Sequence, residues 1–247
     1  MHTETFGSLG WKPGAWFTLA MAAVSLAFCA PASAQGNLDV QAMVHDTQRV
    51  SRSGDQLTLV WWLPEQYWRA SMDANKSVSR LQEEKFLSII RPYNIIAVVD
   101  GQVGAMAGVS YLSEDALRKE VSIKDEQGHV YAPLADDQIG PDAKNLLMVL
   151  KPIIANLLGA LGNNMYFLVF PAQNGNGQFF ANPTKNGMLT VDVGAKVFQF
   201  RLPLGSFLPP MYDAATGERF PGNYRYSPFS GKALSATPPS KVGSNSQ

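Results

Sequence analysis

Histidine and acidic residues are the first candidates for chemistry in this sequence, and their spacing matches no catalytic motif. His45 stands beside Asp46, and His129 follows the turn sequence DEQG. A histidine–aspartate pair needs a nucleophile to form a hydrolytic triad, and the motifs G-x-S-x-G, S-x-x-K and H-E-x-x-H are absent. The paired acids at 83–84 and 136–137 indicate solvated surface. We therefore expect no catalytic residue, no metal and no cofactor, with a hydrolase of dispersed carboxylates as an alternative.

Four aromatic residues within eight positions form a candidate binding surface. Trp61, Trp62, Tyr67 and Trp68 lie across an expected strand–helix junction. If they are exposed, they form a shelf for a protein partner, a glycan or an apolar ligand. Core packing is the competing and more frequent use of such side chains, because aromatic residues dominate core burial. The residues alone leave both interpretations open.

A second constellation lies near the C-terminus, in the stretch YDAATGERFPGNYRYSPFSG at 212–231. Four of its polar residues have the spacing of paired metal-binding knuckles: Asp213, Thr216, Ser227 and Ser230. Gly217 and Gly231 stand where each knuckle would turn the chain, and a Pro-Gly pair between them favours a type II turn. The stretch resembles a degenerate zinc ribbon of the kind that ends in Y-C-P-x-C-G.

The resemblance implies the shape of a zinc ribbon without its metal. One carboxylate and three hydroxyls are poor zinc ligands, since structural zinc prefers thiolate and imidazole. An isolated hairpin is marginally stable without such help, so we expect this one to dock on the rest of the protein. Five aromatic residues are the expected docking side chains: Tyr212, Phe220, Tyr224, Tyr226 and Phe229.

The composition predicts a folded, exported protein without cysteine chemistry. Apolar residues make up 46% of the 247 residues, enough for a core, and the net charge of zero argues against nucleic-acid binding. The single cysteine, Cys29, follows the apolar run AWFTLAMAAVSLAF and precedes Ala34, where a signal peptide would be cleaved. The mature chain would then contain no thiol and no transmembrane segment. A lipoprotein attached through Cys29 is an alternative, although Phe28 is large where such signals place a small residue.

Hydrophobic periodicity predicts the elements of the main domain. Apolar or alternating runs indicate strands at 57–64, 93–101 and 165–172 and hairpins at 121–134 and 188–204. Strand 57–64 is apolar on both faces, which indicates that both faces are covered. Helices are expected after Pro64, at 78–90 and at 141–161. Because helices and strands do not alternate, we expect an α+β fold whose antiparallel, sandwich-like core carries its helices on one side.

The expected organisation has five parts. They are a signal peptide at 1–34, a leader at 35–56, the α+β domain at 57–210, a ribbon-like hairpin at 211–231 and a disordered tail at 232–247. The function that fits best is a non-enzymatic periplasmic or secreted protein that binds a protein or small-molecule partner. A carrier of an apolar small molecule, held between helix 141–161 and the sheet, is the alternative beside the hydrolase. The sequence does not identify the partner.

Overall fold

A sheet with apolar residues on both faces lies at the centre of the protein. The computed structural model describes residues 39–74, 78–104 and 108–239. Strand β2 (Gln56–Trp62) pairs with β1 (Gln48–Ser53) on one side and with β3 (Tyr93–Val103) on the other. The long strand β3 then pairs with β7 (Tyr166–Pro171) along its first half and with β4 (Val109–Tyr111) at its end. All of these pairings are antiparallel.

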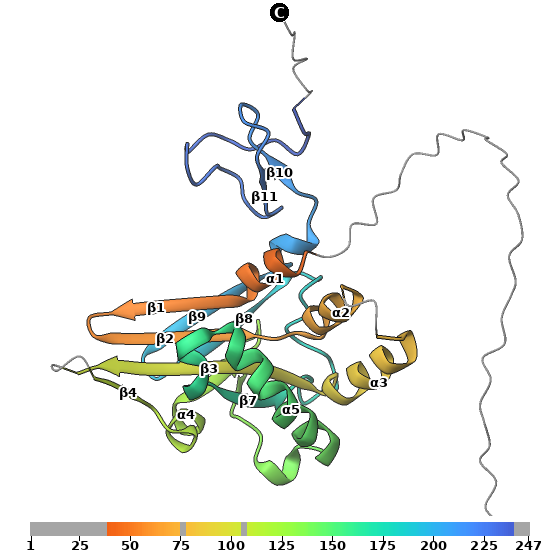
Figure 1. Cartoon of the computed structure of the whole chain (residues 1–247). Helices are drawn as coiled ribbons and strands as arrows, with labels where there is room; N and C mark the ends of the chain where they lie inside the picture. The colour runs from red at the N-terminus through yellow and green to blue at the C-terminus, as the bar shows by residue number, and fades with distance from the viewer. Residues whose placement is uncertain (1–38, 75–77, 105–107, 240–247) are drawn as a thin grey trace, which may run out of the picture. The chain divides into compact units, whose positions relative to one another are not determined.

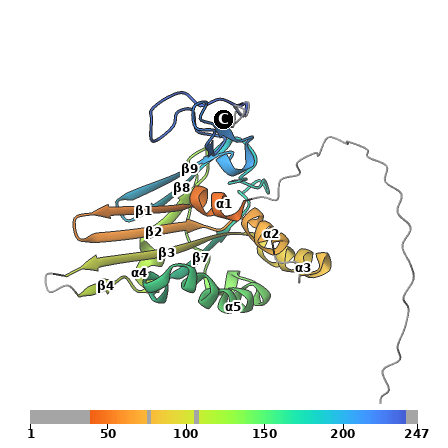
Figure 2. The same cartoon turned by 45° about the horizontal axis from the view of Figure 1, so that its top comes forward.

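A second antiparallel sheet covers one face of the central sheet, and helices cover the other (Figures 1 and 2). The second sheet has the order β6-β5-β8-β9. Its strands are β5 (Val121–Lys124), β6 (Val130–Tyr131), β8 (Gly187–Val193) and β9 (Lys196–Leu202). The α-helices are α1 (Val40–Thr47), α2 (Glu65–Asp73), α3 (Arg80–Ile90), α4 (Glu114–Glu120) and α5 (Pro141–Leu157).

Successive residues of β2 enter two different cores, because side chains alternate across a strand. Trp61 packs in the core on the helix side, which includes Leu147 and Ile154 of α5. Trp62 packs in the core between the two sheets, with its ring 5.8 Å from that of Phe200. The α+β class, the antiparallel pairing and the covering of strand 57–64 on both faces are therefore confirmed.

The prediction that residues 35–56 form a leader is wrong for residues 39–56, the part that the structure describes. Helix α1 and strand β1 lie within it, and α1 begins with Asp39, whose carboxylate accepts hydrogen bonds from the amides of Gln41 and Ala42. The strand QRVSRS lacks an apolar alternation because it lies at the edge of the sheet. Its register comes from the turn that joins it to β2, and Gly54 in this turn has a φ of 55°.

Short elements complete the chain. They are the 3₁₀ turns Asp136–Gln138, Gly159–Asn164 and Gly205–Phe207 (η1, η2 and η3) and the C-terminal strands β10 (Met211–Tyr212) and β11 (Arg219–Phe220). Helix α5 continues through Pro152 and ends at Leu157, four residues before the end of the expected helix 141–161. The 3₁₀ turn η2 begins at Gly159. The expected signal peptide and the end of the tail, 240–247, lie outside the described residues.

A buried polar cluster joins the two sheets. Thr58 of β2 donates to Asp100 of β3 at 2.7 Å, and the amide of Gln56 donates to the other carboxylate oxygen at 2.9 Å. Lys196, at the start of β9, contacts the Thr58 hydroxyl and lies 3.4 Å from Asp100. Asp100 is 4% exposed, so its charge depends on these donors. The ion pair links the second sheet to the first.

Lys196→Met is expected to destabilise the protein by about 3 kcal/mol, because removal of one partner leaves the other charge buried. The measurement is urea unfolding at neutral pH. The double variant Asp100→Leu/Lys196→Met should recover part of the loss, and Lys119→Met on exposed α4 should change stability by less than about 0.5 kcal/mol. Equal stability of Lys196→Met and Lys119→Met would contradict this account of the cluster.

Candidate functional site

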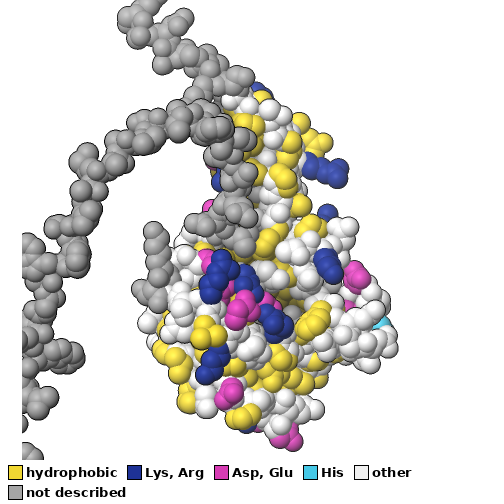
Figure 3. Space-filling view, turned by 90° about the vertical axis from the view of Figure 1, so that its right-hand side faces the viewer, with side chains coloured by type: hydrophobic (Ala, Val, Ile, Leu, Met, Phe, Trp, Pro, Cys, Tyr) yellow, Lys and Arg dark blue, Asp and Glu magenta, His cyan; other side chains and the backbone are white. Residues whose placement is uncertain are grey.

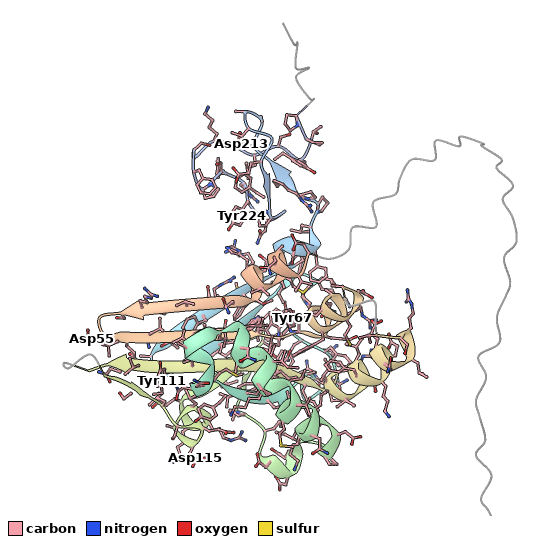
Figure 4. The ribbon with its side chains drawn as sticks, in the orientation of Figure 1. Asp55, Tyr67, Tyr111, Asp115, Asp213 and Tyr224 are labelled. Atoms are coloured by element: carbon pink, nitrogen blue, oxygen red, sulfur yellow. The ribbon has the colours of Figure 1, made fainter. Side chains whose placement is uncertain are left out.

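The four aromatic residues of the expected shelf are buried. Trp61, Trp62, Tyr67 and Trp68 are between 0 and 5% exposed. Tyr67 lies between α2 and the sheet (Figure 4), and its ring is 5.5 Å from that of Trp61 and 5.2 Å from that of Trp68. These side chains form core packing and leave no exposed shelf at this junction. A binding surface must therefore be sought elsewhere.

A cleft of about 580 Å³ opens at the end of the central sheet. Three segments line it: residues 64–66 at the start of α2, residues at the start of β3, and the β7–β8 loop at 172–185. The strands are covered on both faces, so their ends are where the chain can leave an open space. The volume lies within the range of about 300–1,000 Å³ that is typical of ligand pockets.

The β7–β8 loop is ordered by its own side chains. The Asn174 side-chain oxygen accepts from the amides of Asn176 and Gln178, and Phe180 stacks on Tyr131 with ring centres 4.6 Å apart. Ala181 has a φ of 56°, a left-handed conformation that is rare for a residue with a side chain. Such strain is concentrated at functional sites. Phe179 is 54% exposed and borders the cleft.

Arginine–glutamate pairs hold one wall of the cleft. Glu65 accepts from Arg91 at 3.0 and 3.1 Å and from Arg69 at 3.0 Å. Arg69 also pairs with Glu83 and Glu84 on α3. Hydrogen bonds from Arg91, followed by those from Arg69, lower the pKa of Glu65 although its burial opposes this shift. Figure 3 shows basic side chains gathered around acidic ones on the side of the molecule where α2 and α3 lie.

Several polar groups of the cleft have no partner among the described residues. Pro64, the residue before α2, gives no side-chain cap to the amides of Glu65 and Gln66. Asn94 is 6% exposed; its amide donates to the carbonyl of Pro171, while its side-chain oxygen accepts from none of the described residues. Lys185 likewise forms no ion pair with the described part of the chain. These groups are available to a ligand.

Asp125 and His129 form structural contacts outside the cleft. Asp125 is buried and accepts from the His129 ring at 2.9 Å and from the Tyr131 hydroxyl at 3.0 Å. Burial raises the pKa of Asp125, but hydrogen bonds from His129 and Tyr131 outweigh this effect and the net shift is downward. Within the described ranges, no three histidine, cysteine or acidic residues come together as a metal site.

The space proposed for an apolar cargo is filled. Leu147, Leu150 and Ile154 of α5 pack directly against the helix-side core of the sheet. No residue of α5 lines the cleft beside α2 or the two smaller clefts found among the described residues. An apolar carrier site between α5 and the sheet is therefore not supported.

The C-terminal module contains two turns of the same construction. In the first, the Asp213 carboxylate accepts from the amides of Ala215 and Thr216, at 2.8 and 3.1 Å. In the second, the Ser227 hydroxyl accepts from the amides two and three residues later, at 3.3 and 3.2 Å. Each turn closes on a glycine with positive φ, and the Ser230 hydroxyl lies 3.5 Å from Asp213. The hydrogen bonds from these backbone amides lower the pKa of Asp213.

The aromatic residues expected to dock this module have different environments. Phe220 is buried, and Tyr212 and Tyr224 are half-buried. Tyr226 and Phe229 are 63% and 78% exposed, so the expected docking through these two side chains is wrong. The ring of Phe220 lies 6.3 Å from that of Tyr224 and 6.2 Å from that of Phe229, which makes it the centre of a small core within the module.

Backbone contacts join the module to the main domain instead. The amide of Gly222 donates to the carbonyl of Gly205 in η3 at 3.1 Å. A Cβ atom at Gly222 would lie 2.3 Å from the carbonyl oxygen of Pro209 and 2.4 Å from the side chain of Leu208. Gly222 does not have a positive φ, so the expected type II turn is absent. Figure 4 shows Tyr224 on the side of the module nearest α1.

The expected boundary of the module is also too short. Ala233 and Ser235 bridge to Tyr226 and Tyr212, and Leu234 is buried. Residues up to 235 therefore belong to the module and not to a tail. Residues 232–235 gave no apolar periodicity because Leu234 is the one buried residue among these four.

Gly222→Ala is expected to loosen the module, because the added methyl group would clash with backbone at 208–209. We expect a loss of about 2 kcal/mol in urea unfolding and faster proteolysis within 211–239. Gly175→Ala is the matched control, since no atom lies within 4 Å of the added group. If both variants were as stable and as resistant as the wild type, the close approach at Gly222 would not be what holds the module.

None of the helices in the described part of the chain has both the length and the apolar character that a membrane crossing needs. No protein-family model, no curated protein and no solved structure matches this chain.

Proposed function

We propose that this chain is an exported envelope protein, periplasmic or secreted, that has no enzymatic activity and binds a ligand or a segment of a partner in the cleft beside α2. The observation that carries the proposal is the cleft itself. It has the volume of a ligand site, and charged, amide and aromatic groups converge on it from three segments. The strained Ala181 lies in its wall. Support for export comes from the sequence at 1–34, which lies outside the described residues.

The chemistry of the cleft favours binding over hydrolysis. Glu65 is the acidic residue among those that line it, and its carboxylate is held by Arg91 and Arg69. Hydrolysis of a glycoside by paired carboxylates needs a second carboxyl group facing the first, at about 5–10 Å. The remaining polar side chains of the lining are amides, two cations and the Tyr93 hydroxyl, which accepts from the amide of Gly140, and no second carboxylate is among them.

Phe179→Ala is the variant that tests the cleft. A thermal-shift screen of the mature chain against amino acids, dipeptides, sugars, organic acids and phosphate esters should yield ligands whose affinity is then measured by calorimetry. Phe179→Ala should lower the affinity for these ligands about five- to tenfold, because the substitution removes an exposed aromatic ring from the wall of the cleft. Phe229→Ala removes a more exposed ring outside the cleft, 78% against 54% for Phe179, and should leave the affinity unchanged. A screen without ligands, or ligands that bind Phe179→Ala normally, would contradict the proposal.

We also propose that residues 212–231 are a zinc ribbon in which hydrogen bonds replace the metal. Two features support this. The side chains of Asp213 and Ser227 accept hydrogen bonds from backbone amides in two turns of the same construction. The hydroxyl of Ser230 in the second turn also lies near the carboxylate of Asp213 in the first. In zinc-dependent modules the metal contributes about 10–16 kcal/mol to folding. A net hydrogen bond contributes only about 0.5–1.5 kcal/mol, so the module also needs its docking contacts.

The four-residue variant Asp213→Cys/Thr216→Cys/Ser227→Cys/Ser230→Cys tests this second proposal. If the ribbon geometry persists, four thiolates should face one another and bind one equivalent of Co²⁺ with the visible absorption of a tetrahedral site. The matched control keeps Ser230 and carries the other three substitutions, and it should bind the ion more weakly. Absence of stoichiometric tetrahedral binding by the four-residue variant would contradict the ribbon assignment.

A further inference from the structure

From the donors that converge in the cleft, we infer that its ligand is an organic anion, with a carboxylate or phosphate group and a flat apolar body. This inference rests on the proposed binding function of the cleft. It concerns which chemical class of ligand the site selects. Three independent features carry it: the start of α2, the buried side chain of Asn94, and the charge and aromatic character of the walls.

The start of α2 provides backbone donors at the cleft. A helix begins with amides that have no acceptor within the helix, and its dipole favours negative charge there. At α1, α3 and α4 a side chain of Asp39, Ser79 or Ser113 accepts from these amides, whereas α2 and α5 begin without a side-chain cap. Pro64 precedes α2 and has no side-chain acceptor, and Pro64, Glu65 and Gln66 line the cleft. The amides of Glu65 and Gln66 are thus free to bind an anionic group.

Asn94 supplies the second feature. Its side chain is more than nine-tenths buried, it lines the cleft, and its side-chain oxygen accepts no hydrogen bond from the described residues. This oxygen is not among the buried polar atoms that lack a partner, so it is accessible from the cleft, and a ligand donor can reach it. A hydroxyl group on the body of the ligand would satisfy it.

The walls set the charge and the shape of the ligand. Lys185 and Arg91 are the basic residues of the lining and Glu65 is the acidic one, which leaves one net positive charge. Arg91 is committed to Glu65, whereas the ammonium group of Lys185 has no ion-pair partner in the described chain. Phe179, Phe180 and Tyr93 add aromatic surface that can pack against a flat apolar body. An aromatic hydroxy acid has all of the complementary groups.

The test uses 4-hydroxybenzoate and its neutral counterpart 4-hydroxybenzamide as probes of the ¹⁵N-labelled mature chain. We expect 4-hydroxybenzoate to shift the backbone amide signals of Glu65, Gln66 and Lys185. The neutral 4-hydroxybenzamide should bind at least tenfold more weakly. Lys185→Ala should lower the affinity for 4-hydroxybenzoate about fivefold, and Lys185→Arg should retain the affinity of the wild type. Lys119→Ala, a lysine on exposed α4, should have no effect. If inorganic phosphate shifts the same amide signals, the cleft recognises an anionic group without the aromatic body.

Two outcomes would overturn the inference, and they differ in what they mean for the binding function. If the neutral probe binds at the same residues with equal affinity, the cleft binds ligands but does not select anions, and the proposed function stands. If neither probe nor phosphate shifts signals from the residues that line the cleft, the anion inference fails. The wider screen with Phe179→Ala then decides separately whether the cleft binds any ligand.

Discussion

The burial of the central sheet on both faces is the constraint on which the rest of the structure depends. Helices cover one face and a second sheet covers the other, so consecutive residues such as Trp61 and Trp62 must both be apolar. The buried carboxylate of Asp100 on the central sheet is paired, as the Thr58–Asp100–Lys196 cluster shows. Open polar surface is therefore left to the ends of the strands. The cleft beside α2 lies at one such end because the faces have no room for it.

The parts of the fold that follow from this burial could be predicted from the sequence. The runs at 57–64, 93–101 and 165–172 are mostly apolar because most of their residues are buried, and the hairpin at 188–204 alternates because only one face of its sheet is covered. Strand β1 could not be predicted, since its six residues lie at an edge with little burial. Its position depends on pairing with β2, and pairing leaves no pattern in a single strand.

The candidate site could not be predicted for a similar reason. Its groups come from residues 64–66, 91–94 and 172–185, which are distant in the chain, and two of its donors are backbone amides without any sequence signal. The aromatic cluster at 61–68 gave a strong signal that had a different cause. The composition shows only that these side chains are large and aromatic. The alternation along β2 and the first turn of α2 place all four aromatic side chains in the cores of the protein. The only local sign of the cleft is a loop rich in asparagine and glycine that also contains Phe179 and Phe180.

If the C-terminal module is a ribbon without metal, as we propose, its two turns must be held together by weaker interactions. A bound ion cross-links two turns independently of the surroundings, whereas hydrogen bonds of the Asp213 and Ser227 kind are each worth little. The module also contacts η3 through the amide of Gly222, and η3 is in turn held to α1 by a hydrogen bond from the amide of Ser206 to the carboxylate of Asp46 at 2.6 Å. Asp46 is buried, so this link is screened little by solvent. These contacts connect the module to the first helix of the domain, so under the proposed assignment we expect its folding to depend on the domain more than that of a ribbon cross-linked by zinc.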